Sequence, residues 1–175
     1  AIITGLVGSE MCIRDRTSVM GKNPSKFQEG WSAGLRPVES VNWFDCLEFI
    51  SKLNEKETEL RLGLSGTWRL PTEEEWEYAC RAGSVTRWFH SDRDADLDEV
   101  AWHAGNSGAT TREVGQKKAN LWGLHDCHGN VSEWTSTEDG DKRVAKGGSW
   151  LMESESTTSS ARRVIVSTKK SDTIG

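Results

Sequence analysis

Two stretches of the chain place apolar residues with the spacing of an amphipathic helix. The first contains four of them at regular intervals: Phe44, Leu47, Ile50 and Leu53. This pattern predicts a helix over residues 42–57, with the charged residues between them facing solvent. Asn42 is a suitable N-cap for this helix, and Asp45 stands in the capping-box position.

The second helix is predicted over residues 72–83. Thr72 follows Pro71 as the N-cap, and Glu75 completes a capping box. The acidic run at residues 73–75 also suits the positive end of a helix dipole, so it needs no catalytic explanation. The predicted buried stripe consists of Trp76, Ala79 and Cys80. Gly83 is expected to end the helix.

Short runs of β-branched residues predict two strands near the end of the chain, at residues 143–145 and 164–166. Between them, residues 151–160 are rich in Ser, Thr and Glu, which predicts an exposed loop. Residues 17–34 are predicted to be mostly turn, and residues 84–115 irregular chain with short strands at most. Few regular elements are therefore expected besides the two helices.

Residues 1–16 do not fit this pattern. The stretch SEMCIRDR, at residues 9–16, resembles a peptide that arises when adapter DNA is translated in assembled, metagenomic-type sequence data. We therefore expect residues 1–16 to be non-native and poorly packed, and we assign the domain to residues 17–175. Because a native signal peptide would be lost with the true start, neither an extracytoplasmic nor a cytoplasmic location is predicted.

Composition narrows the classes of function. The 175 residues suffice for one domain with a core, and the formal net charge of −5 offers no basic surface for nucleic acid. No run is long and apolar enough to span a bilayer. Nine tryptophans indicate mainly a core of large flat residues, with an aromatic binding surface as the alternative. Four cysteines without a C-x-x-C pair indicate free thiols.

Two segments rich in glycine and tryptophan dominate the C-terminal half: WGLHDCHGNVSEW at residues 122–134 and RVAKGGSW at residues 143–150. Glycine lets backbones pass closely, and buried tryptophan needs a partner for its N–H. We therefore predict tightly packed, irregular chain that holds polar groups in rigid loops. The HDCH stretch at residues 125–128 offers metal ligands, but adjacent residues alone cannot enclose a tetrahedral ion, so packing or hydrogen bonding is favoured.

These segments belong to a set of five that resembles the formylglycine-generating enzyme family, also called sulfatase-modifying factor domains. The other three are VMGKNPSKF (residues 19–27), RPVESVNWFD (36–45) and RLPTEEEWEYACRAG (69–83). All five follow the family's order and cover nearly everything from residue 17 onward. The resemblance implies an α+β fold of C-type-lectin type, with two helices, short antiparallel strands and much irregular structure. It also implies truncation at the C-terminus, where the family continues into a strand beginning Phe-Arg.

The cysteine-oxidising members of this family hold copper through two cysteines that follow the Gly-Gly-Ser-aromatic motif. Met152 and Thr157 occupy the matching positions here, and neither supplies the thiolate that suits Cu(I). The resemblance therefore implies a domain without copper and without oxidation of cysteine to formylglycine.

The resemblance also implies a structural calcium ion held by Asn130 and Glu133 with nearby backbone carbonyls. Oxygen ligands, one of them charged, suit this hard cation. The alternative is that both side chains only satisfy buried backbone groups.

We therefore expect a bacterial-type, non-catalytic domain that binds a protein or small-molecule ligand. In some lectin-fold proteins the C-terminal stretch is diversified for binding, which places the predicted site here at Trp150, Met152, Glu153, Glu155, Thr157 and Arg162. Two alternatives stay open: an accessory, substrate-positioning domain of a larger enzyme, and an oxidase of the same family that uses another metal.

Overall fold

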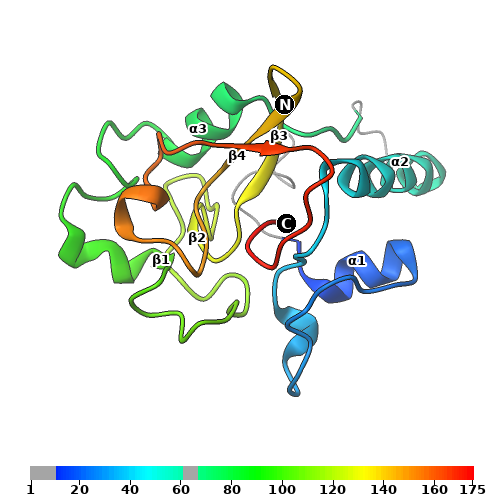
Figure 1. Cartoon of the computed structure of the whole chain (residues 1–175), viewed down its shortest axis with the longest axis horizontal. Coiled ribbons are helices and arrows are strands. Elements are labelled where there is room, and N and C mark those ends of the chain that lie inside the picture. The colour runs from blue at the N-terminus through cyan, green and yellow to red at the C-terminus, as the bar shows by residue number, and fades with distance from the viewer. Residues whose placement is uncertain (1–10, 61–66) are drawn as a thin grey trace.

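The computed structural model describes residues 11–60 and 67–175, with side chains for residues 11–56 and 67–175. It contains three helices: α1 (Ile13–Met20), α2 (Trp43–Leu60) and α3 (Glu73–Arg81). Short 3-10 helices cover Ala33–Leu35 (η1), Asp94–Glu99 (η2) and Ser154–Thr157 (η3). In Figure 1 the sheet occupies the centre, with α1 and α2 to its right and η2 and η3 to its left.

The main sheet is antiparallel and has the order β3-β4-β5. Its strands are β3 (Glu133–Asp139), β4 (Lys142–Lys146) and β5 (Arg163–Val166). In register, Trp134 pairs with Ala145, which pairs with Arg163 on the next strand. A second, parallel pair joins β1 (Ala101–Trp102) to β2 (His128–Gly129). The strands predicted near residues 143–145 and 164–166 are confirmed, whereas β3 and the parallel pair were not predicted.

The C-terminal residues lie beside the start of β3, which Figure 1 shows at the centre of the molecule. The Ser132 amide donates to the Thr173 carbonyl (2.9 Å), and the Gly175 amide donates to the Ser132 carbonyl (2.9 Å). Ile174 is buried in the main core, together with Trp134 and Ala145 of the sheet and Phe49 of α2. Residues 173–175 therefore pack beside the start of β3 and contribute Ile174 to the main core.

Both predicted capping boxes are confirmed. The Asn42 and Asp45 side chains each accept from the other's backbone amide at 2.9 Å. Thr72 accepts from the Glu75 amide, and Glu75 accepts from the Thr72 amide. The stripe of Trp76, Ala79 and Cys80 is buried as predicted. Gly83 follows the C-cap residue Ala82, and both have positive φ.

The predicted apolar face of α2 is wrong by part of a turn. Phe44 and Leu47 are 53% and 38% exposed, whereas Phe49 and Ile50 are buried. Trp43, Cys46 and Leu53 pack against the core around them. Residues at i, i+3, i+6 and i+9 drift by about 60° per step around a helix of 3.6 residues per turn, so they cannot share one face.

The prediction of poor packing for residues 1–16 is wrong where the structure describes them, from residue 11 onward. Cys12 and Ile13 are buried, and Ile13 packs with Val38 and Val41. The Val38 amide donates to the Met11 carbonyl (2.8 Å). The helix α1 that follows replaces the turn predicted from residue 17, and its Met20 joins the main core. Whether residues 1–16 are native stays a prediction.

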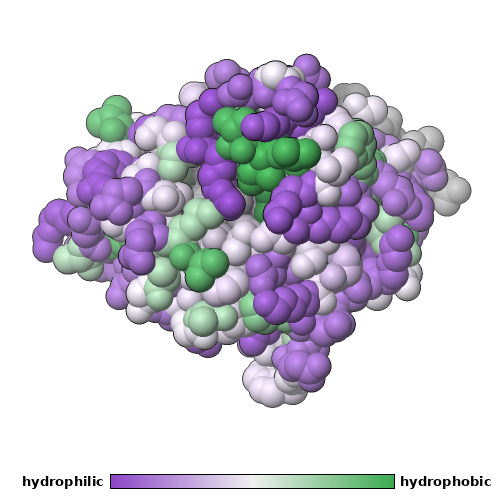
Figure 2. Space-filling model, viewed as in Figure 1, coloured by the Kyte–Doolittle hydropathy of each residue, from purple (hydrophilic) through white to green (hydrophobic). Residues whose placement is uncertain are grey.

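No helix among the described residues combines the length and hydropathy that a membrane crossing requires. The four cysteines are all free, and Cys12, Cys80 and Cys127 are buried. Figure 2 shows apolar residues gathered over the open side of the main sheet, where Val164 and Val166 of the edge strand β5 are exposed.

Candidate functional site

The two glycine-rich segments predicted from sequence lie side by side, at residues 129–132 and 147–150. We call these eight residues the loop framework. The Gly129 amide donates to the Gly147 carbonyl, and the Trp150 amide donates to the Asn130 carbonyl, both at 2.7 Å. The Ser132 hydroxyl donates to the Gly148 carbonyl (3.0 Å). Direct backbone pairing therefore holds the two segments together.

Gly129 shows why the loop framework requires glycine. Its φ is +82°, and a Cβ built there would lie 2.0 Å from the carbonyl oxygen of Trp102. Side chains rarely adopt this backbone conformation, and no real contact is so short. The absence of a side chain lets β2 approach β1, and the next amide, of Asn130, donates to the same carbonyl (2.7 Å).

Asn130 is fully buried, and its side chain bonds to the backbone of Arg112. Its Oδ1 accepts from the Arg112 amide (2.9 Å), and its Nδ2 donates to the Arg112 carbonyl (3.1 Å). A side chain that bonds both backbone groups of a distant residue orders that residue's segment. Asn130 therefore ties residues near 112 to the loop framework.

Trp150 is only 6% exposed, so the expectation that it is exposed is wrong, and its part in binding stays a prediction. Its indole N–H donates to the Asp172 carbonyl (2.8 Å), and its ring meets Phe27 edge-on at 5.5 Å between centroids. The tryptophan ring has its large apolar contact and its hydrogen-bond acceptor inside the fold, which is the arrangement that buried tryptophan favours. Trp150 joins the C-terminal segment to the loop framework.

Thr157 is also buried, with no exposed area, which corrects its prediction as part of an exposed loop. Its hydroxyl accepts from the indole of Trp88 (3.1 Å) and donates to the Ser154 carbonyl (2.8 Å). Its carbonyl accepts from Nδ1 of the buried His128 (2.7 Å), whose Nε2 accepts from the Phe89 amide (3.2 Å). Thr157 is therefore a hydrogen-bonded structural residue of the fold.

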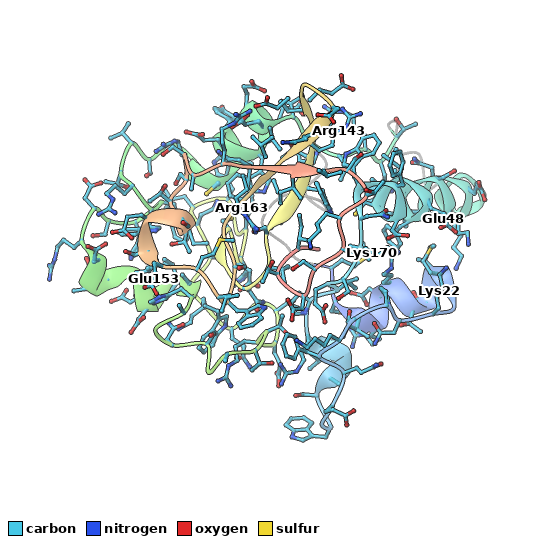
Figure 3. The ribbon with its side chains drawn as sticks, in the orientation of Figure 1. Lys22, Glu48, Arg143, Glu153, Arg163 and Lys170 are labelled. Atoms are coloured by element: carbon cyan, nitrogen blue, oxygen red, sulfur yellow. The ribbon has the colours of Figure 1, made fainter. Side chains whose placement is uncertain are left out.

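The loop predicted over residues 151–160 consists of two unlike halves. Leu151, Glu153 and Glu155 are exposed, and Met152 is half-buried. Residues 157–159 are buried. Figure 3 labels Glu153 beside the short helix η3 on the outer side of the molecule. Three of the six predicted binding residues, Met152, Glu153 and Glu155, thus stand together at the surface, which we call the outer loop (residues 151–156).

Arg162 is exposed, but it forms ion pairs away from the outer loop. Its guanidinium bridges Glu73 of α3 (2.9 Å) and Asp139 of β3 (2.9 Å). Glu73 also lies 3.7 Å from the ammonium of the buried Lys146, which contacts Glu77 at 3.2 Å. Arg162 therefore belongs to an ion network between α3 and the sheet and not to the outer loop.

Asn130 and Glu133, the calcium ligands that the family resemblance implies, both have hydrogen-bond partners inside the fold. Glu133 Oε2 accepts from the indole of Trp76 (2.8 Å), and Trp76 packs with Cys127. Asp126 is buried, and within the described chain its Oδ1 has no hydrogen-bond partner. Oxygen donors of this kind suit calcium.

The charges of both carboxylates affect the buried Cys127 thiol. The Cys80 thiol and burial raise the pKa of Cys127, and the charges of Glu133 and Asp126 add to this. Burial also raises the pKa of Asp126, although its Oδ2 accepts from the Gly115 amide (2.6 Å). No cluster of three or more His, Cys, Asp or Glu among the described residues could hold a metal ion, so a cation here would need main-chain carbonyls. The sequence analysis considered Asp126 only within the stretch at residues 125–128 and not together with Glu133, because its burial depends on segments that are distant in sequence.

The comparison with known proteins agrees with this architecture. The family model of the sulfatase-modifying factor enzyme 1-like domain matches residues 6–175. The chain is 31% identical over 184 residues to the chaperone protein LppX of Paenibacillus barcinonensis, covering 76% of this chain and 64% of that protein. It is 34% identical over 159 residues to the inactive C-alpha-formylglycine-generating enzyme 2 of Bos taurus, covering 77% of this chain and 47% of that protein.

Among solved structures, Treponema denticola variable protein 1 superimposes with a TM-score of 0.83 at 29% identity, over 95% of this chain and 80% of that one. The chain thus spans about half to two thirds of the length of these two curated relatives. It belongs to the formylglycine-generating enzyme (sulfatase-modifying factor) family and has that family's C-type-lectin-like fold.

Proposed function

We propose that this domain is a non-catalytic member of its family that binds a protein or small-molecule ligand through the outer loop. The environment of Thr157 is the observation that supports the absence of catalysis. Its hydroxyl is bonded to Trp88 and Ser154, and the other matching position is Met152. Neither residue supplies a thiolate for copper.

The backbone contacts of the outer loop support its proposed role in ligand binding. The Ala104 amide donates to the Met152 carbonyl (3.0 Å), and the hydroxyl of the buried Thr157 donates to the Ser154 carbonyl (2.8 Å). The exposed Leu151, Glu153 and Glu155 are thus presented on backbone that is held at both ends. A rigid scaffold that carries variable side chains is a common design for recognition loops.

The names of two relatives agree with a role other than oxidation. The bovine relative is described as inactive, and the relative from Paenibacillus barcinonensis as a chaperone protein. Because the chain spans only part of each, the domain could equally act by positioning a partner for another domain. A structural calcium ion near Asp126 and Glu133 forms part of this proposal.

Copper and a cysteine peptide test the absence of oxidation. We expect the purified domain incubated with Cu(I) to retain no stoichiometric copper and to form no aldehyde on a cysteine-containing peptide under oxygen. Mass spectrometry measures both results. Stoichiometric copper together with formylglycine in the peptide would overturn the non-catalytic assignment.

Arrays of peptides and glycans test binding by the outer loop. We expect at least one probe to bind the labelled domain and to lose binding in the L151S/E153K/E155K variant. The matched control is W31S/E29K, which changes an equally exposed surface where Trp31 is 95% exposed. Binding that survives the loop variant, or that disappears equally in the control, would contradict the outer loop as the site.

A further inference from the structure

Two neighbouring arginines at the start of β5 have opposite surroundings. Arg162 is exposed and bonded to the carboxylates of Glu73 and Asp139. Arg163 is half-buried, and the side-chain bond it makes runs from Nη1 to the Ser132 hydroxyl (3.0 Å). Within the described residues, no carboxylate lies at ion-pair distance from Arg163, and no neighbouring charge offsets its burial.

This arrangement is unfavourable for a cation. Burial lowers the pKa of Arg163 from its ordinary value, yet a guanidinium stays protonated at neutral pH. A charge removed from water without a counter-charge costs free energy, which is why buried charges are generally paired. A half-buried guanidinium without a carboxylate partner leaves most of its N–H donors open to an anion from outside the chain.

The strand register and Ser132 orient the guanidinium of Arg163, and the residue stays partly exposed. Arg163 pairs with Ala145, which pairs with Trp134, so its side chain lies on the face of the sheet that carries Trp134. Figure 3 shows Arg163 in the middle of the face, between η3 and the C-terminal segment. The Ser132 hydroxyl donates to Gly148, so it can only accept from Arg163, and this fixes one edge of the guanidinium.

The hydroxyl of Ser149 supplies a second observation. Ser149 follows Gly148 directly and is fully buried, and among the described residues its Oγ has no hydrogen-bond partner. A buried hydroxyl without a partner is uncommon in a folded protein. The loop framework thus holds an unused donor in the residue after Gly148, whose carbonyl accepts from the Ser132 hydroxyl that orients Arg163.

We propose that Arg163, held by Ser132, binds a carboxylate group of a ligand, with Ser149 as an additional donor. One of the guanidinium's five N–H groups is used by Ser132, and a carboxylate accepts two parallel N–H bonds from such a fork. A single guanidinium balances a singly charged carboxylate, whereas a phosphate dianion would leave one charge uncompensated. The proposed carboxylate site is independent of the ligand binding proposed for the outer loop.

Acetate titration of the full chain, followed by NMR with labelled arginine, tests the proposal. We expect the Nε–Hε resonance of Arg163 to shift and saturate with sodium acetate at constant ionic strength, while that of Arg162 moves little. The amide resonances of Ser132 and Ser149 should follow the same curve. In R163M, we expect about tenfold more acetate for the same amide shifts, and in the control R162M a change within about twofold.

Several results would overturn the site. The first is a shift of the Arg163 resonance that does not saturate with acetate. The second is an equal shift with sodium chloride, and the third is an equal shift at Arg162 and Arg163. Each of these would show that the salt only screens charges and does not bind at the site. Tighter binding of inorganic phosphate than of acetate would overturn the assignment to carboxylates. If R163M does not fold, the titration of the unmodified chain still decides, because it needs no variant.

Discussion

The loop framework and residues 151–160 contain two regions of opposite physical character. The inner region comprises the loop framework and residues 157–159, where buried polar side chains such as Ser132 and Thr157 are bonded to distant residues. The outer region, residues 151–156, carries exposed side chains on a backbone that the inner region holds. Stability should therefore depend on the first region and recognition on the second.

The substitution with the largest expected effect is G129A. The added Cβ would meet the Trp102 carbonyl, and φ at this position is positive. We expect the free energy of unfolding to fall by about 4 kcal/mol or more, as measured by urea denaturation. G140A is the matched control, because Gly140 also has positive φ but a Cβ added there would meet nothing within 4 Å, and about 1 kcal/mol is expected there. Equal losses in both variants would show that close packing of the inner region is unimportant.

Calcium should stabilise the inner region through Asp126 and Glu133. At 100 times the dissociation constant, binding to the folded state alone adds about 2.7 kcal/mol, which raises the melting temperature. We expect D126N to abolish this rise and EGTA to reverse it in the unmodified chain, with differential scanning calorimetry as the measurement. A melting temperature that does not respond to calcium would remove the ion from the proposal.

Replacing Thr157 by valine tests the contribution of the inner region to stability, because the two side chains have nearly the same volume. The change leaves the Trp88 N–H without its acceptor in a buried place, which should cost about 1–3 kcal/mol. The L151S/E153K/E155K variant of the outer region should change the free energy of unfolding by less than about 0.5 kcal/mol. Comparable losses in the two variants would mean that the outer loop also carries the fold.

The smallest expected effect concerns an exposed pair outside both regions. The Arg69 guanidinium and the Thr72 amide lower the pKa of Glu75 to about 2. The folded state therefore gains stability above the unfolded pKa near 4.5, and this gain is lost as pH falls from there towards about 2. Because the pair is exposed, solvent screening limits it to less than about 1 kcal/mol. Comparing acid unfolding of E75Q with the unmodified chain measures it, and a larger difference in acid than near neutral pH would contradict this sign.

How much of the fold could be predicted depends on the sequence separation of the contacts. The capping boxes of Asn42 and Thr72 involve residues three positions apart, so the pattern identifies them directly. The burial of Thr157 depends on Trp88, and the burial of Trp150 depends on Phe27 and Asp172. Nothing near residues 150–157 indicates these partners, and their polar composition predicted exposure instead.

The candidate site shows the same limit. The family's motifs indicated that the segments around Asn130 and Trp150 belong together, and the pairing of their backbones agrees with this. The motifs did not distinguish Arg162 from Arg163, because strand register and the position of α3 decide which of them meets Glu73. The burial of Asp126 could not be predicted for a similar reason, since it arises from segments that are distant in sequence.

The two arginines, Arg162 and Arg163, also help to fix the register of β5 in the sheet. Successive residues of a strand face opposite sides, so a slip of one residue would turn every side chain of β5 to the other face. In one direction Ala161 would take the place of Arg162, and the network with Glu73 and Asp139 would lose its cation. In the other direction Val164 would take the place of Arg163 opposite Ala145, and Ser132 would lose its guanidinium partner. A change in length between Ser159 and Arg162 that shifts β5 by one residue should consequently cost both arginine contacts, whereas a change that the loop absorbs should cost neither.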